Sequence, residues 1–271
     1  MTNEPELDIN TAFFEVNGGR LAVQQCGAGD PLVLIHGMAT DHRLWQPQLT
    51  AFAEHFRVIT YDLRGFGDSS RPDGPYRAED DLARLLQMLE LPDANIIGLS
   101  LGSSIATRFA LEYPSLCRSL VLAGPVLQGF GDADDFLSAL KQVWAIGREQ
   151  GVAAAKKEWL SLPLFTTLLH SDQARFAREM IAQYDGWHWQ NRDPESWPQV
   201  MPAERLGDIN AKTLVVVGDQ EIPGLARAAE ALHSGIADAR LVRIDHAGHV
   251  VNLEQPHQFN KLVLEFLSDG R

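Results

Sequence analysis

The chain of 271 residues has little of three features that would point to other classes of protein. Its only two cysteines, Cys26 and Cys117, argue against a disulfide framework and are typical of a reducing compartment. No apolar run approaches the ~18 residues that a transmembrane helix needs. Basic residues number 23 against 36 acidic ones, and the formal net charge of -13 disfavours nucleic-acid binding. The acidic start, MTNEPELDIN, lacks the features of a signal peptide. We therefore expect a cytoplasmic protein that binds neither nucleic acid nor membrane.

Short, continuous runs of branched apolar residues recur along the chain. Such runs predict strands that are buried on both faces, as in a parallel sheet covered by helices. They lie at 32–35, 58–61, 96–99, 120–123, 214–217 and 241–244. The last run is interrupted by Arg243 and suits an edge strand. Residues 13–25 alternate around Asn17-Gly18-Gly19, which predicts a β-hairpin.

Amphipathic helical patterns separate these runs and predict an α/β fold built from βαβ units. They cover 78–91, 103–113 and 255–267. The alternation of strand and helix patterns stops at 125–206, where helical patterns at 134–150 and 173–185 occur without buried strands between them. This stretch also holds five of the six tryptophans. We therefore expect a core formed by 1–124 and 207–271, with 125–206 inserted as a helical cap.

A G-x-S-x-G pattern, Gly98-Leu99-Ser100-Leu101-Gly102, lies directly between a predicted buried strand and a predicted helix. In this setting a sharp turn needs small flanking residues and lifts the serine hydroxyl clear of the sheet. The start of the helix adds free N–H groups and a partial positive charge. The pattern therefore predicts a nucleophile at Ser100, and an ordinary strand–turn–helix connection is the alternative.

Five segments, in this order along the chain, resemble the α/β-hydrolase superfamily. They are 32–38 (LVLIHGM), 61–69 (YDLRGFGDS), 98–102 (GLSLG), 214–219 (LVVVGD) and 247–256 (AGHVVNLEQP). The resemblance covers nearly the whole chain and is nearest to the branch of carboxylesterases, enol-lactonases and acyl-homoserine lactonases. It implies an α/β-hydrolase fold: a mostly parallel, eight-stranded sheet flanked by helices, with a helical cap after strand 6.

The resemblance also implies the partners of Ser100. His249 matches the Ala-Gly-His of the family's catalytic histidine better than His246 does, so we expect His249 to be the general base. The family's acid falls on Glu221, and Asp219 remains the alternative because both carboxylates follow the same strand. A metal bound by the two histidines is not expected, because no third ligand is evident.

The oxyanion hole is expected, from the same resemblance, to consist of the backbone N–H groups of Met38 and Leu101. His36, Asp62 and Arg64 are expected to hold loops in place. Four aromatic residues of the predicted cap are candidates for the wall of an apolar pocket, and they are Trp144, Trp159, Phe165 and Trp187.

These features predict a serine hydrolase that cleaves a small carboxylic ester or lactone with a hydrophobic portion through an acyl-enzyme. No cofactor is expected, because neither a dinucleotide fingerprint nor a P-loop occurs. The protein is expected to be a monomer or homodimer. Three alternatives remain open: a carbon–carbon bond hydrolase of ring-cleavage products, a cofactor-free perhydrolase or haloperoxidase, and a ligand receptor with a vestigial triad.

Overall fold

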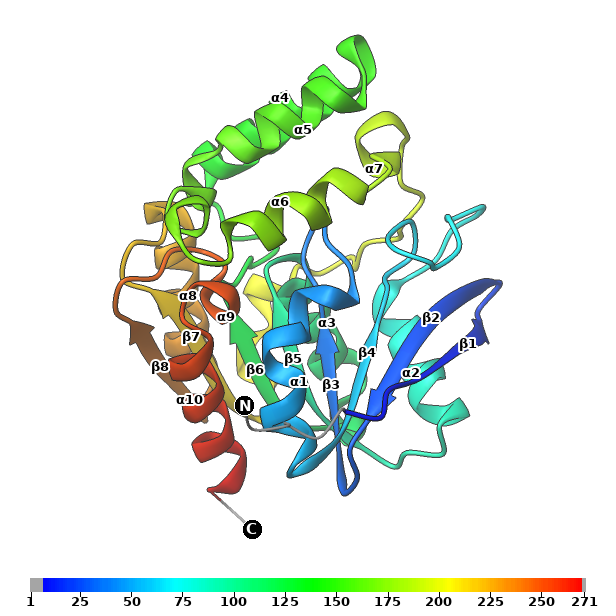
Figure 1. Cartoon of the computed structure of the whole chain (residues 1–271). Helices are drawn as coiled ribbons and strands as arrows, with labels where there is room; N and C mark the ends of the chain where they lie inside the picture. Colours follow the sequence, from blue (N-terminus) through cyan, green and yellow to red (C-terminus); the bar gives the residue numbers. More distant parts are fainter. Residues whose placement is uncertain (1–6, 270–271) are drawn as a thin grey trace, which may run out of the picture.

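An eight-stranded sheet runs through the centre of the molecule in the computed structural model, which describes residues 7–269 (Figure 1). The strands are β1 (Asn10–Val16), β2 (Gly19–Cys26), β3 (Asp30–Ile35), β4 (Phe56–Tyr61), β5 (Ala94–Leu99), β6 (Cys117–Ala123), β7 (Lys212–Gly218) and β8 (Ala239–Ile244). Their order is β1-β2-β4-β3-β5-β6-β7-β8. The pairs β1–β2 and β2–β4 are antiparallel, and the other neighbours are parallel. The predicted fold class is confirmed.

The continuous apolar runs form the buried centres of the strands from β3 to β7, whereas the run of β8 is only partly buried because this strand lies at an edge of the sheet. Every residue of β5 is buried, and so is every residue of β7 after Lys212. Each strand begins two or three residues before its run, because ladder hydrogen bonds extend past the apolar residues. β8 lies at an edge as predicted, and Arg243 there reaches Glu230 at 2.7 Å.

Helices cover both faces of the sheet. The α-helices are α1 (Gln46–Ala53), α2 (Ala78–Met88), α3 (Leu101–Glu112), α4 (Asp134–Gln150), α5 (Val152–Ser161), α6 (Ala174–Gln183), α7 (Trp187–Gln190), α8 (Pro223–Gly235), α9 (Val251–Glu254) and α10 (Pro256–Ser268). Short 3-10 helices lie at His42–Trp45, Pro114–Leu116, Pro163–Phe165, Leu168–His170, Pro202–Glu204 and Leu206–Asp208. α1 and α10 pack together in front of the sheet in Figure 1, and α3 lies behind it.

Several helix ends differ from the prediction by one to three residues, and two of the differences have a clear cause. α2 ends at Met88 rather than at residue 91, because Glu90 has a φ of 56° that no α-helix continues through. α3 begins at Leu101, two residues early, since the helix starts directly after the turn at Ser100.

The segment between β6 and β7 contains α4 to α7. These helices lie above the carboxyl ends of the parallel strands in Figure 1. We name residues 125–206 the cap segment; their division from the core at these boundaries remains a prediction. Both cysteines are free and buried. Among residues 7–269, no helix combines the length and apolarity needed to cross a membrane.

Candidate active site

Ser100 occupies the sharp turn between β5 and α3. Its backbone has φ 55° and ψ -115°, a strained conformation for a residue with a side chain. A Cβ on Gly98 would lie 2.2 Å from the carbonyl oxygen of Gly102, and one on Gly102 would lie 2.1 Å from that of Ile35. The two glycines are therefore required for this turn, as the sequence pattern predicts.

The imidazole of His249 lies between Ser100 and Glu221. Its Nε2 is 2.9 Å from the Ser100 Oγ, and its Nδ1 is 2.7 Å from a Glu221 carboxylate oxygen. The His249 side chain is 2% exposed and that of Glu221 is fully buried. With Nδ1–H donating to Glu221, Nε2 is left as an acceptor for the Ser100 hydroxyl proton. The structure thus brings together three residues from three distant segments.

Asp219, the alternative acid, does not reach the imidazole. Its carboxylate accepts a hydrogen bond from the backbone N–H of Ala247 at 3.2 Å. The second oxygen of Glu221 accepts from the N–H of Ile222 at 2.9 Å, which fixes the Glu221 carboxylate. Of the two candidates, the geometry brings Glu221 to His249.

The electrostatic surroundings favour a protonatable His249. Burial lowers its pKa, but the charge and hydrogen bond of Glu221, with a smaller contribution from Glu254, more than offset this effect. The net result is a pKa of His249 above its ordinary value. The imidazolium that would form when Ser100 loses its proton is therefore stabilised in place.

Glu254, which has no predicted role, braces the loop that carries His249. Its carboxylate accepts hydrogen bonds from the backbone N–H groups of Gly248 at 2.5 Å and Val250 at 2.8 Å. Burial raises the pKa of Glu254, against the opposing effect of these two bonds. The residue lies within the segment that carries the family resemblance, but nothing in its spacing distinguishes it from a surface glutamate.

The two expected oxyanion donors flank Ser100. Leu101 is the first residue of α3, so its N–H has no acceptor within the helix. Met38 follows Gly37, and a Cβ on Gly37 would lie 3.4 Å from the Cβ of Ser100. Met38, Leu101 and Ser100 all line one cavity. The arrangement can present two backbone donors to an oxygen bonded near Ser100.

His36 and Asp62 stabilise the loops below this site, as expected. His36 is fully buried; its Nδ1 donates to the carbonyl of Gly37 at 2.8 Å, and its Nε2 accepts from the N–H of Leu63 at 3.0 Å. Burial lowers the pKa of His36, which keeps the ring neutral. The loop before Met38 is thereby tied to the loop after β4.

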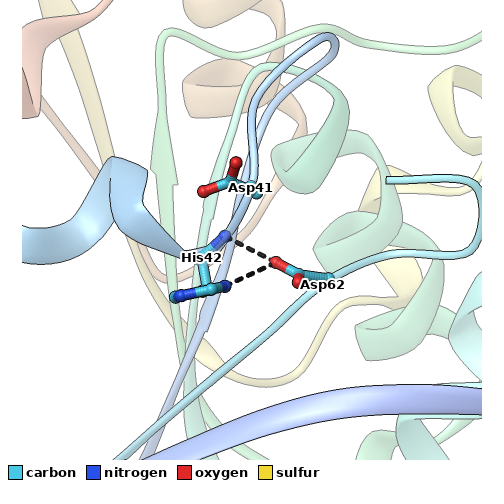
Figure 2. Close-up of side chains that lie close together, drawn as sticks. All are labelled: Asp41, His42 and Asp62. Atoms are coloured by element: carbon cyan, nitrogen blue, oxygen red, sulfur yellow. Dashed lines mark hydrogen bonds and ion pairs between the residues drawn. The ribbon is translucent and has the colours of Figure 1, made fainter. Parts of the chain in front are cut away.

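Among residues 7–269, Asp41, His42 and Asp62 form the one group of at least three His, Cys, Asp or Glu side chains that could hold a metal ion (Figure 2). One potential ligand atom from each lies within 4.8 Å of the other two. Asp62 accepts from the backbone N–H and Nδ1 of His42 through one oxygen and from Asp68 through the other. Asp41 accepts three hydrogen bonds from Arg43, one from its backbone N–H and two from its guanidinium. Because protein donors already occupy these carboxylates, the cluster fits a loop clasp better than a metal site.

The cavity above Ser100 has a volume of about 820 Å³. Trp144 and Trp159 line it, together with apolar residues of the cap segment such as Phe130 and Leu140. The structure does not place Phe165 and Trp187 in its wall. Phe165 packs edge-to-face against Trp159 with ring centres 5.2 Å apart, and Trp187 packs against His188 at 4.8 Å.

Known proteins resemble this chain over most of its length. Residues 30–256 match the family model described as alpha/beta hydrolase fold. The 2-hydroxymuconate semialdehyde hydrolase of Pseudomonas sp. strain CF600 is 30% identical over 99% of this chain and 96% of its own. The 3-oxoadipate enol-lactonase 2 of Acinetobacter baylyi is 27% identical over 86% of each. A hydrolase structure from Pseudomonas aeruginosa PA01 has a TM-score of 0.83 and 29% identity, covering 96% of this chain and 98% of that chain. The chain belongs to the alpha/beta hydrolase fold family.

Proposed function

We propose that this protein is a serine hydrolase that cleaves a carboxylic ester or lactone through an acyl-enzyme on Ser100. The observation that carries the proposal is the continuous hydrogen-bonded line from Ser100 through His249 to Glu221. A serine hydroxyl is a weak nucleophile near neutral pH and needs such a base. The intact contacts also argue against a receptor with a vestigial site.

The geometry supports a two-step reaction. His249 Nε2 takes the Ser100 proton while Oγ bonds to the substrate carbonyl carbon, and the N–H groups of Met38 and Leu101 stabilise the oxyanion. The carbon–oxygen bond then breaks, and the leaving alcohol takes the proton from His249. In the second step His249 activates water, which attacks the acyl-enzyme, and the acid is released while Ser100 regains its proton.

The walls of the cavity support a substrate with a hydrophobic portion. Trp144, Phe136 and Leu140 come from α4, and Leu225 and Ala228 come from α8. Burial of apolar substrate surface against such a wall contributes about 25 cal/mol per Å². The proposal includes a small-molecule substrate, no cofactor and a cytoplasmic location, which rest on the sequence argument.

A carbon–carbon bond hydrolase is a second candidate, because the relative from Pseudomonas sp. is named a semialdehyde hydrolase. Arg148 and Arg192 also line the cavity, and neither forms an ion pair with another residue of the stretch 7–269. Two unpaired guanidinium groups suit a carboxylate-bearing substrate. Cleavage of a vinylogous diketone without ester turnover would favour this candidate.

The test is a panel of p-nitrophenyl esters and acyl lactones, with a vinylogous diketone added. We expect Ser100→Ala to lower kcat by at least about a thousandfold. A fluorophosphonate should label Ser100 in the wild-type protein, and the exposed Ser268→Ala should serve as the matched control. Ester turnover that persists in Ser100→Ala would overturn the proposed mechanism.

A further inference from the structure

Three buried side chains in the wall of the Ser100 cavity carry a polar atom that has no hydrogen-bond partner among residues 7–269. These atoms are the Tyr61 hydroxyl, the Ser104 Oγ and the Trp159 Nε1. The three residues are only 1%, 2% and 3% exposed. Buried polar groups are nearly always paired, and leaving them unpaired destabilises a fold. Because all three residues line one cavity, a bound molecule can supply the missing partners once the side chains that cover these atoms shift.

Ser104 lies one turn beyond Ser100 on the same face of α3. Positions i and i+4 of a helix are neighbours, with a rise of about 5.4 Å per turn. The adjacent Ser103 is fully used, since its hydroxyl donates to the Ser100 carbonyl at 2.6 Å and accepts from the N–H of Val126 at 3.0 Å. Thr107 likewise donates to the carbonyl of Ser103. Ser104 is therefore the α3 hydroxyl left for a ligand.

Tyr61 is the last residue of β4 and lines the cavity, and the charges of Asp81, Arg108 and Glu79 act on its hydroxyl. These charges are paired, because Asp81 lies 2.6 Å from Arg64 and Glu79 lies 3.0 Å from Arg108. Burial raises the pKa of Tyr61, which keeps its hydroxyl neutral and able to donate. Beside Tyr61 the guanidinium groups of Arg64 and Arg108 are thus already paired with carboxylates, so this part of the cavity offers hydroxyl donors to a neutral oxygen rather than a free cation to a carboxylate.

We propose that Ser104 and Tyr61 form a polar subsite that binds a second, neutral oxygen of the substrate. This inference rests on the proposed function and narrows it to esters or lactones with an additional keto, hydroxyl or ether oxygen. That oxygen lies about one helical turn from the scissile carbonyl. Trp159 adds an N–H donor from the cap segment.

The experiment compares p-nitrophenyl 4-oxohexanoate and 5-oxohexanoate with the plain hexanoate. We expect the wild-type protein to favour one oxo ester in kcat/KM. Ser104→Ala and Tyr61→Phe should each lower the ratio of oxo to plain ester by about tenfold. The intrinsic reactivity of the esters cancels when this ratio is compared between variants. An unchanged ratio in both variants overturns the subsite.

Thr60→Val is the matched control. The Thr60 hydroxyl is also buried without a partner among the described residues, but Thr60 does not line the cavity. Its removal should leave the ratio unchanged. Because the Ser104 and Tyr61 hydroxyls have no hydrogen-bond partner within the described range 7–269, we expect Ser104→Ala and Tyr61→Phe to keep or raise Tm. A lower Tm together with an unchanged ratio would assign these hydroxyls to the fold instead.

A binding measurement separates failure of the subsite from failure of the proposed function. In the Ser100→Ala background, methyl 4-oxohexanoate or 5-oxohexanoate should bind more tightly than methyl hexanoate, and adding Ser104→Ala should abolish the difference. This result can hold even where the wild-type protein hydrolyses no ester. Equal affinity for oxo and plain esters would sink the subsite while leaving ester hydrolysis intact.

Discussion

The G-x-S-x-G pattern predicts Ser100 as the nucleophile and the family resemblance predicts His249 as the base, but they leave the choice of the acid open. Glu221 and Asp219 follow the same strand, and their order along the chain does not tell which carboxylate faces an imidazole 28 positions away. The structure separates them, because Asp219 is bonded to the backbone of Ala247 while Glu221 reaches His249. That distinction depends on the path of two loops.

Glu221→Gln should keep the shape of the site but lower kcat/KM by about a thousandfold or more. A neutral amide neither stabilises the imidazolium nor selects the tautomer with Nε2 free. Asp219→Asn is the control and should cost less than about tenfold. Steady-state kinetics on p-nitrophenyl hexanoate measure both, and a larger loss in the Asp219 variant would reverse the assignment.

The pH dependence of kcat/KM tests the same pair of residues, Glu221 and His249. The base must be neutral to accept the Ser100 proton, so kcat/KM falls as the pH drops through the pKa of His249. Since Glu221 raises this pKa, the acid limb should have its midpoint above the ordinary value of about 6.5. In Glu221→Gln the midpoint should move to lower pH. A midpoint that stays in place would show that Glu221 does not set the charge state of His249.

The aromatic residues of the cap segment show another limit of sequence reasoning at this scale. All four candidates lie in the predicted cap, yet Phe165 and Trp187 pack against other rings instead of lining the cavity. Helical spacing predicts which face of a helix is apolar, but it does not predict whether that face packs against other side chains or lines a cavity.

Secondary-structure elements were predictable where burial is uniform. The continuous runs predicted the strands, and the amphipathic patterns predicted α2, α3 and α10 within a few residues. The loops that orient the site were less predictable, because buried polar contacts hold them. Glu254 is the main example, since two backbone N–H groups of the His249 loop depend on it.

Glu254→Gln should loosen this loop. An amide offers only one acceptor oxygen, so either the N–H of Gly248 or that of Val250 loses its partner. We expect a loss of about 1–3 kcal/mol in the free energy of unfolding, measured by urea denaturation. The exposed Glu265→Gln is the control and should change little. Equal stability of both variants would show that the two bonds are not needed by the fold.

At the scale of the whole molecule, a buried ion cluster joins the core to the cap segment. Arg108 of α3 is buried and lies 3.0 Å from Glu79 and 2.5 Å from Glu195 of the cap segment. Arg108 and Glu195 are 87 positions apart, so no local pattern could have paired them. The sequence predicted a cap, but it did not predict the ion pairs that join the cap to the core.

Arg108→Met should destabilise the protein by about 3–5 kcal/mol, because the buried Glu195 loses its cation and the buried Glu79 is left with Arg77 alone. Urea denaturation at neutral pH measures the loss. Arg175→Met removes a fully exposed partner of Glu179 and should leave the curve nearly unchanged. A small effect of Arg108→Met would mean that Glu79 and Glu195 take up protons or water readily.

Ser100, Glu221 and His249 all follow strands of one sheet, with β6 between the strand that precedes Ser100 and those that precede Glu221 and His249. Much of the wall of the Ser100 cavity instead belongs to the segment inserted between β6 and β7. In the proposed function, the residues that carry out the reaction and most of those that select the substrate thus lie in different segments of the chain. The inserted helices can change in length and composition, and so admit new substrates, without disturbing the sheet that aligns the proton transfer.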